Sequence, residues 1–217
     1  MFVTQQPVAA LALIAFFLLL SFPVHEFAHA FTAYRLGDST AKMFGKLTLN
    51  PIAHFDQFGG TMLVLSILVV GFPFGFAQTP VNPRNLRGKY GEAIVAAAGP
   101  ISNLLIAAAF AIPLRVLFPE TAGVQQIYTT EVELVLKFIV QGSIILGLFN
   151  LIPIPPLDGG AIMLSLVSPR TAWQLRPLLS QYGFFLIILL ILPIGGTSIL
   201  GRFLYPIADS IYAVLVG

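Results

Sequence analysis

Long apolar stretches alternate with short polar connections along almost the whole chain. Within the stretch 7–36, residues Val8 to Tyr34 are apolar apart from two histidines, one glutamate and small hydroxyl residues, and the stretch 90–117 is rich in alanine. At about 1.5 Å per residue in a helix, each is long enough to cross a bilayer core of about 30 Å. The pattern therefore predicts two helices that cross a membrane.

A third apolar stretch, 132–167, contains three prolines within the run NLIPIPPLDGG of residues 150–160. Each proline removes a backbone donor and collides with the preceding turn, so this stretch is predicted to be a broken helix. Residues 181–216 are expected to form two closing segments around Ile194-Gly195-Gly196. The first of these segments is short for a full crossing.

The region 37–89 has a different character from the predicted helices. Its first part is rich in Gly, Asp, Ser, Thr, Asn and Pro, and Lys46–Leu49 alternates in polarity as a strand does. Residues 61–77 are apolar but have basic residues on both sides. A single crossing cannot leave both flanks in the cytoplasm, so we favour a segment that dips into the membrane and returns, with a plain crossing helix as the alternative.

Composition places the chain outside the soluble class. Hydrophobic residues make up 57% of it and charged residues only 9%. We therefore expect an all-α polytopic membrane protein, residues 1–217 forming one domain with about five or six membrane segments and a small strand-containing loop region on the cytoplasmic side. The net charge of +2 gives no reason to expect nucleic-acid binding, and the oligomeric state is not predicted.

The positions of the basic residues predict an orientation. Arg35, Lys42 and Lys46 follow the first helix, and Arg170 and Arg176 follow the broken helix. By the positive-inside rule these ends face the cytoplasm. No basic residue precedes Arg35, so we expect the N-terminal segment to be retained rather than cleaved as a secretory signal.

The first helix carries a metal-binding pattern, His25-Glu26-Phe27-Ala28-His29. Residues four apart lie on one helix face, so both imidazoles can reach one ion, and Glu26 beside them can take a proton from an activated water. If Arg35 marks the interface, the histidines lie roughly 9 to 15 Å inside the membrane. An acidic side chain at that depth is costly and is tolerated mostly at functional sites.

The third ligand is predicted to be Asp158. Cysteine is absent from the chain, so a metal must be held by His, Asp or Glu, and Asp158 is the only other acidic residue deep in an apolar segment. A broken helix can aim a carboxylate inward, and Gly159 and Gly160 allow another backbone to come close. The alternative is that Asp158 only caps the helix that restarts after the prolines.

Taken together, these motifs resemble those of the site-2 protease family of intramembrane zinc metalloproteases, peptidase family M50. The resemblance also includes Asn50-Pro51 with His54 and Asp56, the run from Phe76 to Asn85, Gly99-Pro100-x-x-Asn103, and Phe149-Asn150 before the proline run. It implies one Zn²⁺ held by His25, His29 and Asp158, Glu26 as the catalytic base, and hydrolysis of peptide bonds in or at the edge of the membrane.

Two features depart from that family. Many relatives have another membrane helix before the zinc motif, so this chain is expected to be a short form. Pro23 lies two residues before His25 and should kink the helix at the ligands, which the resemblance does not explain.

Three further polar residues are candidates for the site. Asn103 and Asn150 are buried amides that could bind a substrate carbonyl or the oxyanion, support the ligands, or simply join helices. His54 could reach the metal region or substrate, although a structural role is favoured.

The predicted partners are a transmembrane protein substrate and the lipid bilayer, in a prokaryotic plasma membrane with the active site toward the cytoplasm. The competing functions are a transporter or ion-binding protein, because broken helices also mark transport sites, and an inactive relative that binds membrane peptides.

Overall fold

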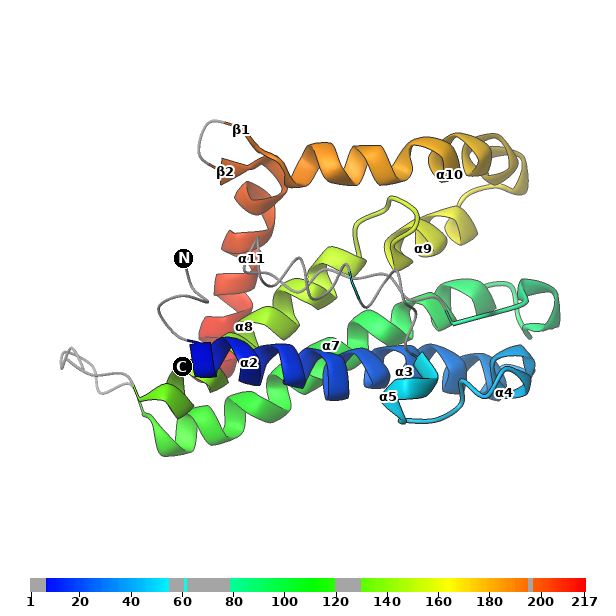
Figure 1. Cartoon of the computed structure of the whole chain (residues 1–217). Coiled ribbons are helices and arrows are strands. Elements are labelled where there is room, and N and C mark those ends of the chain that lie inside the picture. Colours follow the sequence, from blue (N-terminus) through cyan, green and yellow to red (C-terminus); the bar gives the residue numbers. More distant parts are fainter. Residues whose placement is uncertain (1–6, 55–60, 62–78, 120–129, 195–196) are drawn as a thin grey trace.

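The computed structural model describes residues 7–54, 61, 79–119, 130–194 and 197–217. Within these residues the chain is almost entirely helical, as predicted, with one short antiparallel hairpin. Figure 1 shows α3 and α7 running side by side, with α8 crossing them at a slant and α10 lying along the opposite side. The elements, in chain order, are α2 (Pro7–Phe16), the π-helix η1 (Phe17–Ser21), α3 (Phe22–Arg35), α4 (Thr40–Met43), α5 (Pro51–His54), the 3₁₀ helix η2 (Pro83–Asn85), α7 (Gly91–Leu117), α8 (Glu131–Asn150), α9 (Asp158–Leu166), α10 (Pro169–Ile191), β1 (Pro193–Ile194), β2 (Thr197–Ser198) and α11 (Ile199–Val216).

The first predicted membrane helix is the continuous rod made by α2, η1 and α3. Its π-helical turn ends two residues before Pro23, and the N–H of Phe22 donates to the carbonyl of Phe17. Because Pro23 has no N–H, it cannot continue the regular α-helical ladder at this point. The expected irregularity at Pro23 therefore takes the form of a π turn, which leaves α3 regular through the zinc motif.

The core lies where α7, α8 and α11 pack together. Its fully buried centre includes Ala107, Leu114, Val140, Ile144 and Ala208. Small residues on α7 and α8 let the helices approach closely, as membrane helices do. This packing fixes the position of α7, which also forms one wall of the site.

The broken helix is confirmed and its break is well defined. α8 ends at Asn150, and α9 begins at Asp158 after a turn-rich connection. A Cβ added at Gly159 would overlap the carbonyls of Leu151 and Ile152, and one at Gly160 would overlap the backbone nitrogen of Pro155. The two glycines therefore allow the start of α9 to pack against the backbone of the connection that breaks the helix.

The closing segments differ from the prediction in one boundary. α10 begins at Pro169 rather than near 181, because Ser168 caps it by accepting from the N–H of Thr171 and proline suits a first helical position. At 23 residues, α10 is long enough to cross a membrane, and it is one of five helices in the described chain that are long and apolar enough to do so. In Figure 1, α11 descends from the hairpin crosswise to α10, which brings Ala208 against the core.

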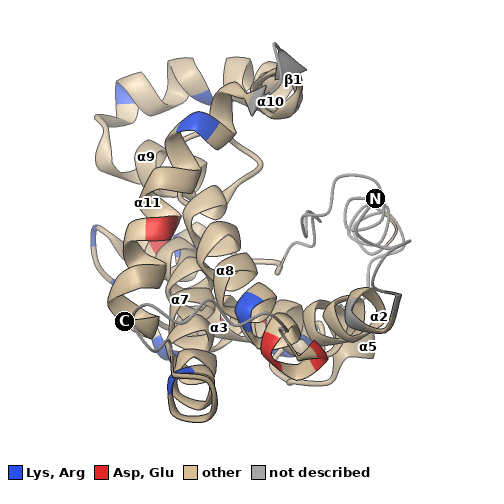
Figure 2. Cartoon of the chain, turned by 90° about the vertical axis from the view of Figure 1, so that its left-hand side faces the viewer, with Lys and Arg blue, Asp and Glu red and all other residues tan. Residues whose placement is uncertain are grey.

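The loop region on the side of α4 contains two short helices, α4 and α5, with no strand in the described residues between them. Lys46–Leu49 has no strand conformation, so that prediction was wrong. The predicted re-entrant segment 61–77 lies, apart from Thr61, outside the described residues. Figure 2 shows how little charge the ribbons carry, with long parts of α7, α8 and α10 uncharged.

Candidate metal centre

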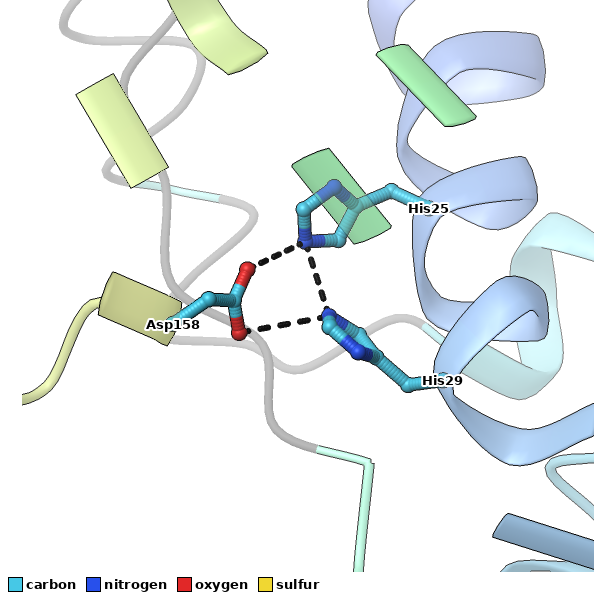
Figure 3. A group of neighbouring side chains, drawn as sticks. All are labelled: His25, His29 and Asp158. Carbon is cyan, nitrogen blue, oxygen red and sulfur yellow. Dashed lines mark hydrogen bonds and ion pairs between the residues drawn. The ribbon is translucent and has the colours of Figure 1, made fainter. Parts of the chain in front are cut away.

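The structure brings His25, His29 and Asp158 together, as Figure 3 shows. The two histidines lie one turn apart on α3, and Asp158 is the first residue of α9. The Nε2 atoms of the histidines are 3.1 Å apart, and each faces one carboxylate oxygen of Asp158, at 3.2 Å from His25 and 3.3 Å from His29.

These separations fit a zinc ligand set. Ligands about 2.0 to 2.1 Å from a tetrahedral zinc lie about 3.3 Å from one another. Both imidazoles are buried. The Oδ2 atom of Asp158 is also buried, and no described residue gives it a well-directed hydrogen bond. Three ligand atoms that are at least partly buried thus converge, an arrangement that a cation stabilises.

Asp158 does not act as a simple helix cap. The N-cap position of α9 is Leu157, and the Asp158 carboxylate points away from its own helix toward the two imidazoles. The proline break is what allows this direction, because it starts a new helix, packed against α7, whose first residue faces the histidines of α3.

The other face of each imidazole is also held. The Nδ1 atom of His29 lies 2.8 Å from the carbonyl of Val95, and that of His25 lies 3.0 Å from the side-chain amide of Asn103. Both partners are on α7. At Gly99, between them on α7, an added Cβ would overlap both imidazole rings. The face of α7 from Val95 to Asn103 is therefore shaped to fit the two rings.

Glu26 lies beside the three residues without joining them. It is buried, and its Oε2 atom accepts a hydrogen bond of 2.6 Å from the hydroxyl of Thr79. Glu26, Thr79 and the three converging residues line one cavity of about 390 Å³. Val81, Asn150 and the ion pair between Arg176 and Glu92, 3.4 Å apart, line it as well.

A second cluster fixes the segment that carries Thr79. The buried carboxylate of Asp38 accepts hydrogen bonds from the backbone of Asn82 at 2.7 Å and the side chain of Asn85 at 3.0 Å, and from Thr40. Burial alone would raise the pKa of Asp38, but these hydrogen bonds outweigh it and lower the pKa below its usual value. Asp38 thus ties residues 82–85 to the end of the helix that carries Glu26.

The secondary candidates fall in different places. Asn150 lines the cavity and donates to the carbonyl of Leu146 at 3.1 Å, which leaves one amide N–H free of that bond. His54 is buried on α5, does not line the cavity, and lies 2.6 Å from the carbonyl of Thr48.

Four residues at the site were missed by the sequence reasoning: Ser21, Asp38, Thr79 and Val95. Only Ser21 had a local signal, because it lies four residues before His25 and therefore on the same helix face. The contacts of the other three join segments far apart in the chain.

Comparison with known proteins agrees with this geometry. A family model described as Peptidase family M50 matches residues 13–130 and 117–190. The chain is 36% identical over 207 residues to a Bacillus subtilis (strain 168) protein named "Putative zinc metalloprotease YwhC", covering 94% of this chain and 91% of that protein. It is 32% identical over 184 residues to "Putative zinc metalloprotease Rip2" of Mycolicibacterium smegmatis, covering 80% of this chain and 64% of that protein. No solved structure matches the chain.

A buried His, His and Asp set inside a bundle of apolar helices could hold a metal ion, as in a membrane-embedded metalloenzyme. The chain belongs to peptidase family M50, the site-2 protease family, and is a zinc metalloprotease with several membrane-spanning helices. Family membership favours a protease over the transporter that the broken helix also allowed.

Proposed function

We propose that this protein cleaves peptide bonds of membrane-spanning proteins. In this proposal His25, His29 and Asp158 hold a single zinc ion, and Glu26 is the general base. The observation that carries the proposal is the convergence of three ligand atoms at 3.1 to 3.3 Å, with Glu26 in the same cavity.

The chemistry follows from the residues around the cavity. Bound zinc supplies a Lewis acid that makes water nucleophilic near neutral pH. Glu26 takes the proton of the attacking water and returns it to the leaving amine as the peptide bond breaks. Asn150 is the proposed donor to the carbonyl oxygen, which becomes negatively charged in the tetrahedral intermediate, because Asn150 lines the cavity and only one N–H of its amide is needed for the bond to Leu146.

A substrate helix must be locally unwound before it is cut, since its peptide groups are otherwise held in hydrogen bonds. We propose that the unwound segment pairs with the non-helical residues 79–82, of which Thr79 and Val81 line the cavity. Pairing with Lys46–Pro51 is the second possibility. Proline substitutions within Leu47–Leu49 that leave cleavage unchanged would exclude it.

The active site is proposed to open toward the cytoplasm of a bacterial cell. Eight of the eleven basic residues lie at the end of the bundle where α3 ends and α7 and α10 begin: Arg35, Lys42, Lys46, Arg84, Arg87, Lys89, Arg170 and Arg176. By the positive-inside rule, that excess supports a cytoplasmic position for this end. The relatives named above are bacterial, which favours a bacterial plasma membrane.

The test uses the purified full chain in detergent and single-span candidate substrates labelled on either side of the membrane segment. The parent should hold about one zinc per chain and cleave at least one substrate, with activity lost on chelation and restored by zinc. Glu26→Gln should keep the zinc but cleave at least about a hundredfold more slowly. Glu92→Gln, which changes another glutamate lining the same cavity, should remain active; equal cleavage by Glu26→Gln and the parent would falsify the proposal.

A further inference from the structure

The pair Ser21 and Asn103 stands behind one of the two histidines, away from the cavity. Ser21 and Asn103 are both fully buried in the bundle, on η1 and α7. The hydroxyl of Ser21 donates to the Oδ1 atom of Asn103 at 3.5 Å, and the Nδ2 atom of the Asn103 amide lies 3.0 Å from the Nδ1 atom of His25. A fully buried serine and amide in contact with a metal-ligand candidate call for a physical explanation.

Zinc binding sets a requirement on the proton of each imidazole. The Nε2 atoms of His25 and His29 are the ones that face Asp158, so a metal there needs their lone pairs. A neutral imidazole has one N–H, which must then be at Nδ1. Each histidine consequently needs a hydrogen-bond acceptor at Nδ1.

For His29 the backbone meets this requirement. Its Nδ1 atom lies 2.8 Å from the carbonyl of Val95, and a carbonyl oxygen can only accept. The proton of His29 is therefore held at Nδ1, and its Nε2 lone pair is free for a metal.

For His25 the partner at Nδ1 is the side-chain amide of Asn103, which can either donate or accept a hydrogen bond. In the structure the amide nitrogen of Asn103 faces Nδ1. In that orientation the amide donates to Nδ1, and the His25 proton goes to Nε2, where it blocks a metal. If the amide turns over, its oxygen accepts the Nδ1 proton and its nitrogen faces Ser21, whose hydroxyl can accept as well as donate. Only the second orientation is compatible with zinc.

We propose that Asn103 is a positioning residue of the metal centre, which selects the zinc-binding tautomer of His25 through its amide oxygen, and that Ser21 holds the amide in that orientation. This inference rests on the proposed function, because it assumes that zinc binds at His25. It assigns Asn103 to the support of a ligand rather than to the oxyanion, since its amide contacts the rear of His25 instead of substrate.

The experiment measures zinc affinity, which needs no substrate. The purified full chain in detergent is titrated with zinc against a chromophoric chelator, in the parent and in Asn103→Leu, Asn103→Asp and Ser21→Ala. Asn103→Leu has nearly the same shape but no acceptor, and should lower zinc affinity by about 10- to 100-fold, the range found for partners of metal-bound histidines. Asn103→Asp keeps an acceptor and should stay within a few-fold of the parent.

Two further variants separate this role from general packing. Ser21→Ala should weaken zinc binding less than Asn103→Leu. The Asn103 amide then loses its hydrogen bond to Ser21 but keeps the oxygen that accepts from His25. Ser102→Ala is the matched control: Ser102 is the neighbour of Asn103 on α7, and its hydroxyl donates to the carbonyl of Gly99 at 2.7 Å. It should bind zinc as the parent does.

A second readout follows the tautomer itself. In the zinc-loaded parent with ¹⁵N-labelled histidine, the His25 signal should be that of an imidazole protonated at Nδ1, and Asn103→Asp should preserve it. The proposal is overturned if Asn103→Leu binds zinc as tightly as the parent, or if Asn103→Asp loses as much affinity as Asn103→Leu. A parent that binds no zinc would instead refute the proposed function, so the two failures are distinguishable.

Discussion

Gly99 offers the sharpest test of how closely α7 is fitted to the two histidines. A Cβ at this position would lie 2.6 Å from both the Cε1 and the Nε2 atoms of His25 and would also overlap Nε2 of His29. Comfortable contact between such atoms needs about 3.5 Å, so the methyl group of Gly99→Ala must displace the rings by about 1 Å. Metal sites tolerate ligand displacements of about 0.2 Å.

Zinc affinity of Gly99→Ala should therefore fall by more than about a hundredfold, beyond the effect expected for loss of a partner behind a ligand. The assay is the same chelator competition, combined with the metal content of the purified protein. Folding stability should fall by only about 1 to 3 kcal/mol, the usual cost of one extra methyl group in a packed core.

A matched glycine exists away from the metal. A Cβ at Gly142 on α8 would lie 2.8 Å from the ring of Phe17, so Gly142→Ala also overpacks a helix contact. It should lower stability by a similar amount while leaving zinc affinity unchanged. Zinc binding by Gly99→Ala at the affinity of the parent, or an equal loss in Gly142→Ala, would refute the view that Gly99 makes room for the ligands.

Substitutions at three other positions test the surroundings of the site. Thr79→Val should slow cleavage by about tenfold with zinc content unchanged, because one hydrogen bond to the Glu26 carboxylate is lost, and Thr79→Ser should restore the rate; no rescue by serine would contradict this. Asp38→Asn should lower stability at neutral pH by about 2 kcal/mol, since the amide keeps one oxygen but turns its N–H groups toward the donor of either Asn82 or Asn85, which bind different oxygens of Asp38. Folding lowers the pKa of Asp38, so its contribution to folding stability is present above its unfolded pKa of about 3.9 and is lost as the pH falls through the lower folded value. The melting temperatures of parent and variant should therefore converge in that acidic range. A difference in melting temperature that does not depend on pH would exclude this linkage. Gly159→Ala should disrupt the break between α8 and α9 and so reduce both stability and zinc content, whereas an unchanged melting curve and zinc content would show that the added Cβ is accommodated.

The parts of the site that sequence predicts are those set by local geometry. His25 and His29 converge because four residues make about one helical turn, and Asp158 stood out because an acidic residue in an apolar segment is costly. The break before Asp158 follows from three prolines within four residues, Pro153 to Pro156. None of these conclusions requires knowledge of which helices pack together.

The errors have equally local causes. Polarity alternates over Lys46–Leu49, but alternation favours a strand only where a partner strand completes its hydrogen bonds, and none of the described residues provides one here. The start of α10 was placed too late because Arg170 and Arg176 interrupt the apolar run. The pair Ser168-Pro169 is typical of a helix start, but the hydropathy pattern alone does not reveal it.

Pro23 links the irregular part of the first helix to the chemistry of the site. A proline in a regular helix would leave a carbonyl without its donor and would press its ring against the preceding turn. The π turn of η1 takes up this misfit before the ligands, and its extra residue changes which side chains face α7 and α8. Ser21, the last residue of that turn, faces Asn103, whereas Phe17 at its start lies against Gly142. A proline beside a metal motif thus does more than bend the helix: it keeps α3 regular where His25 and His29 must align, and it sets Ser21 behind the first of them.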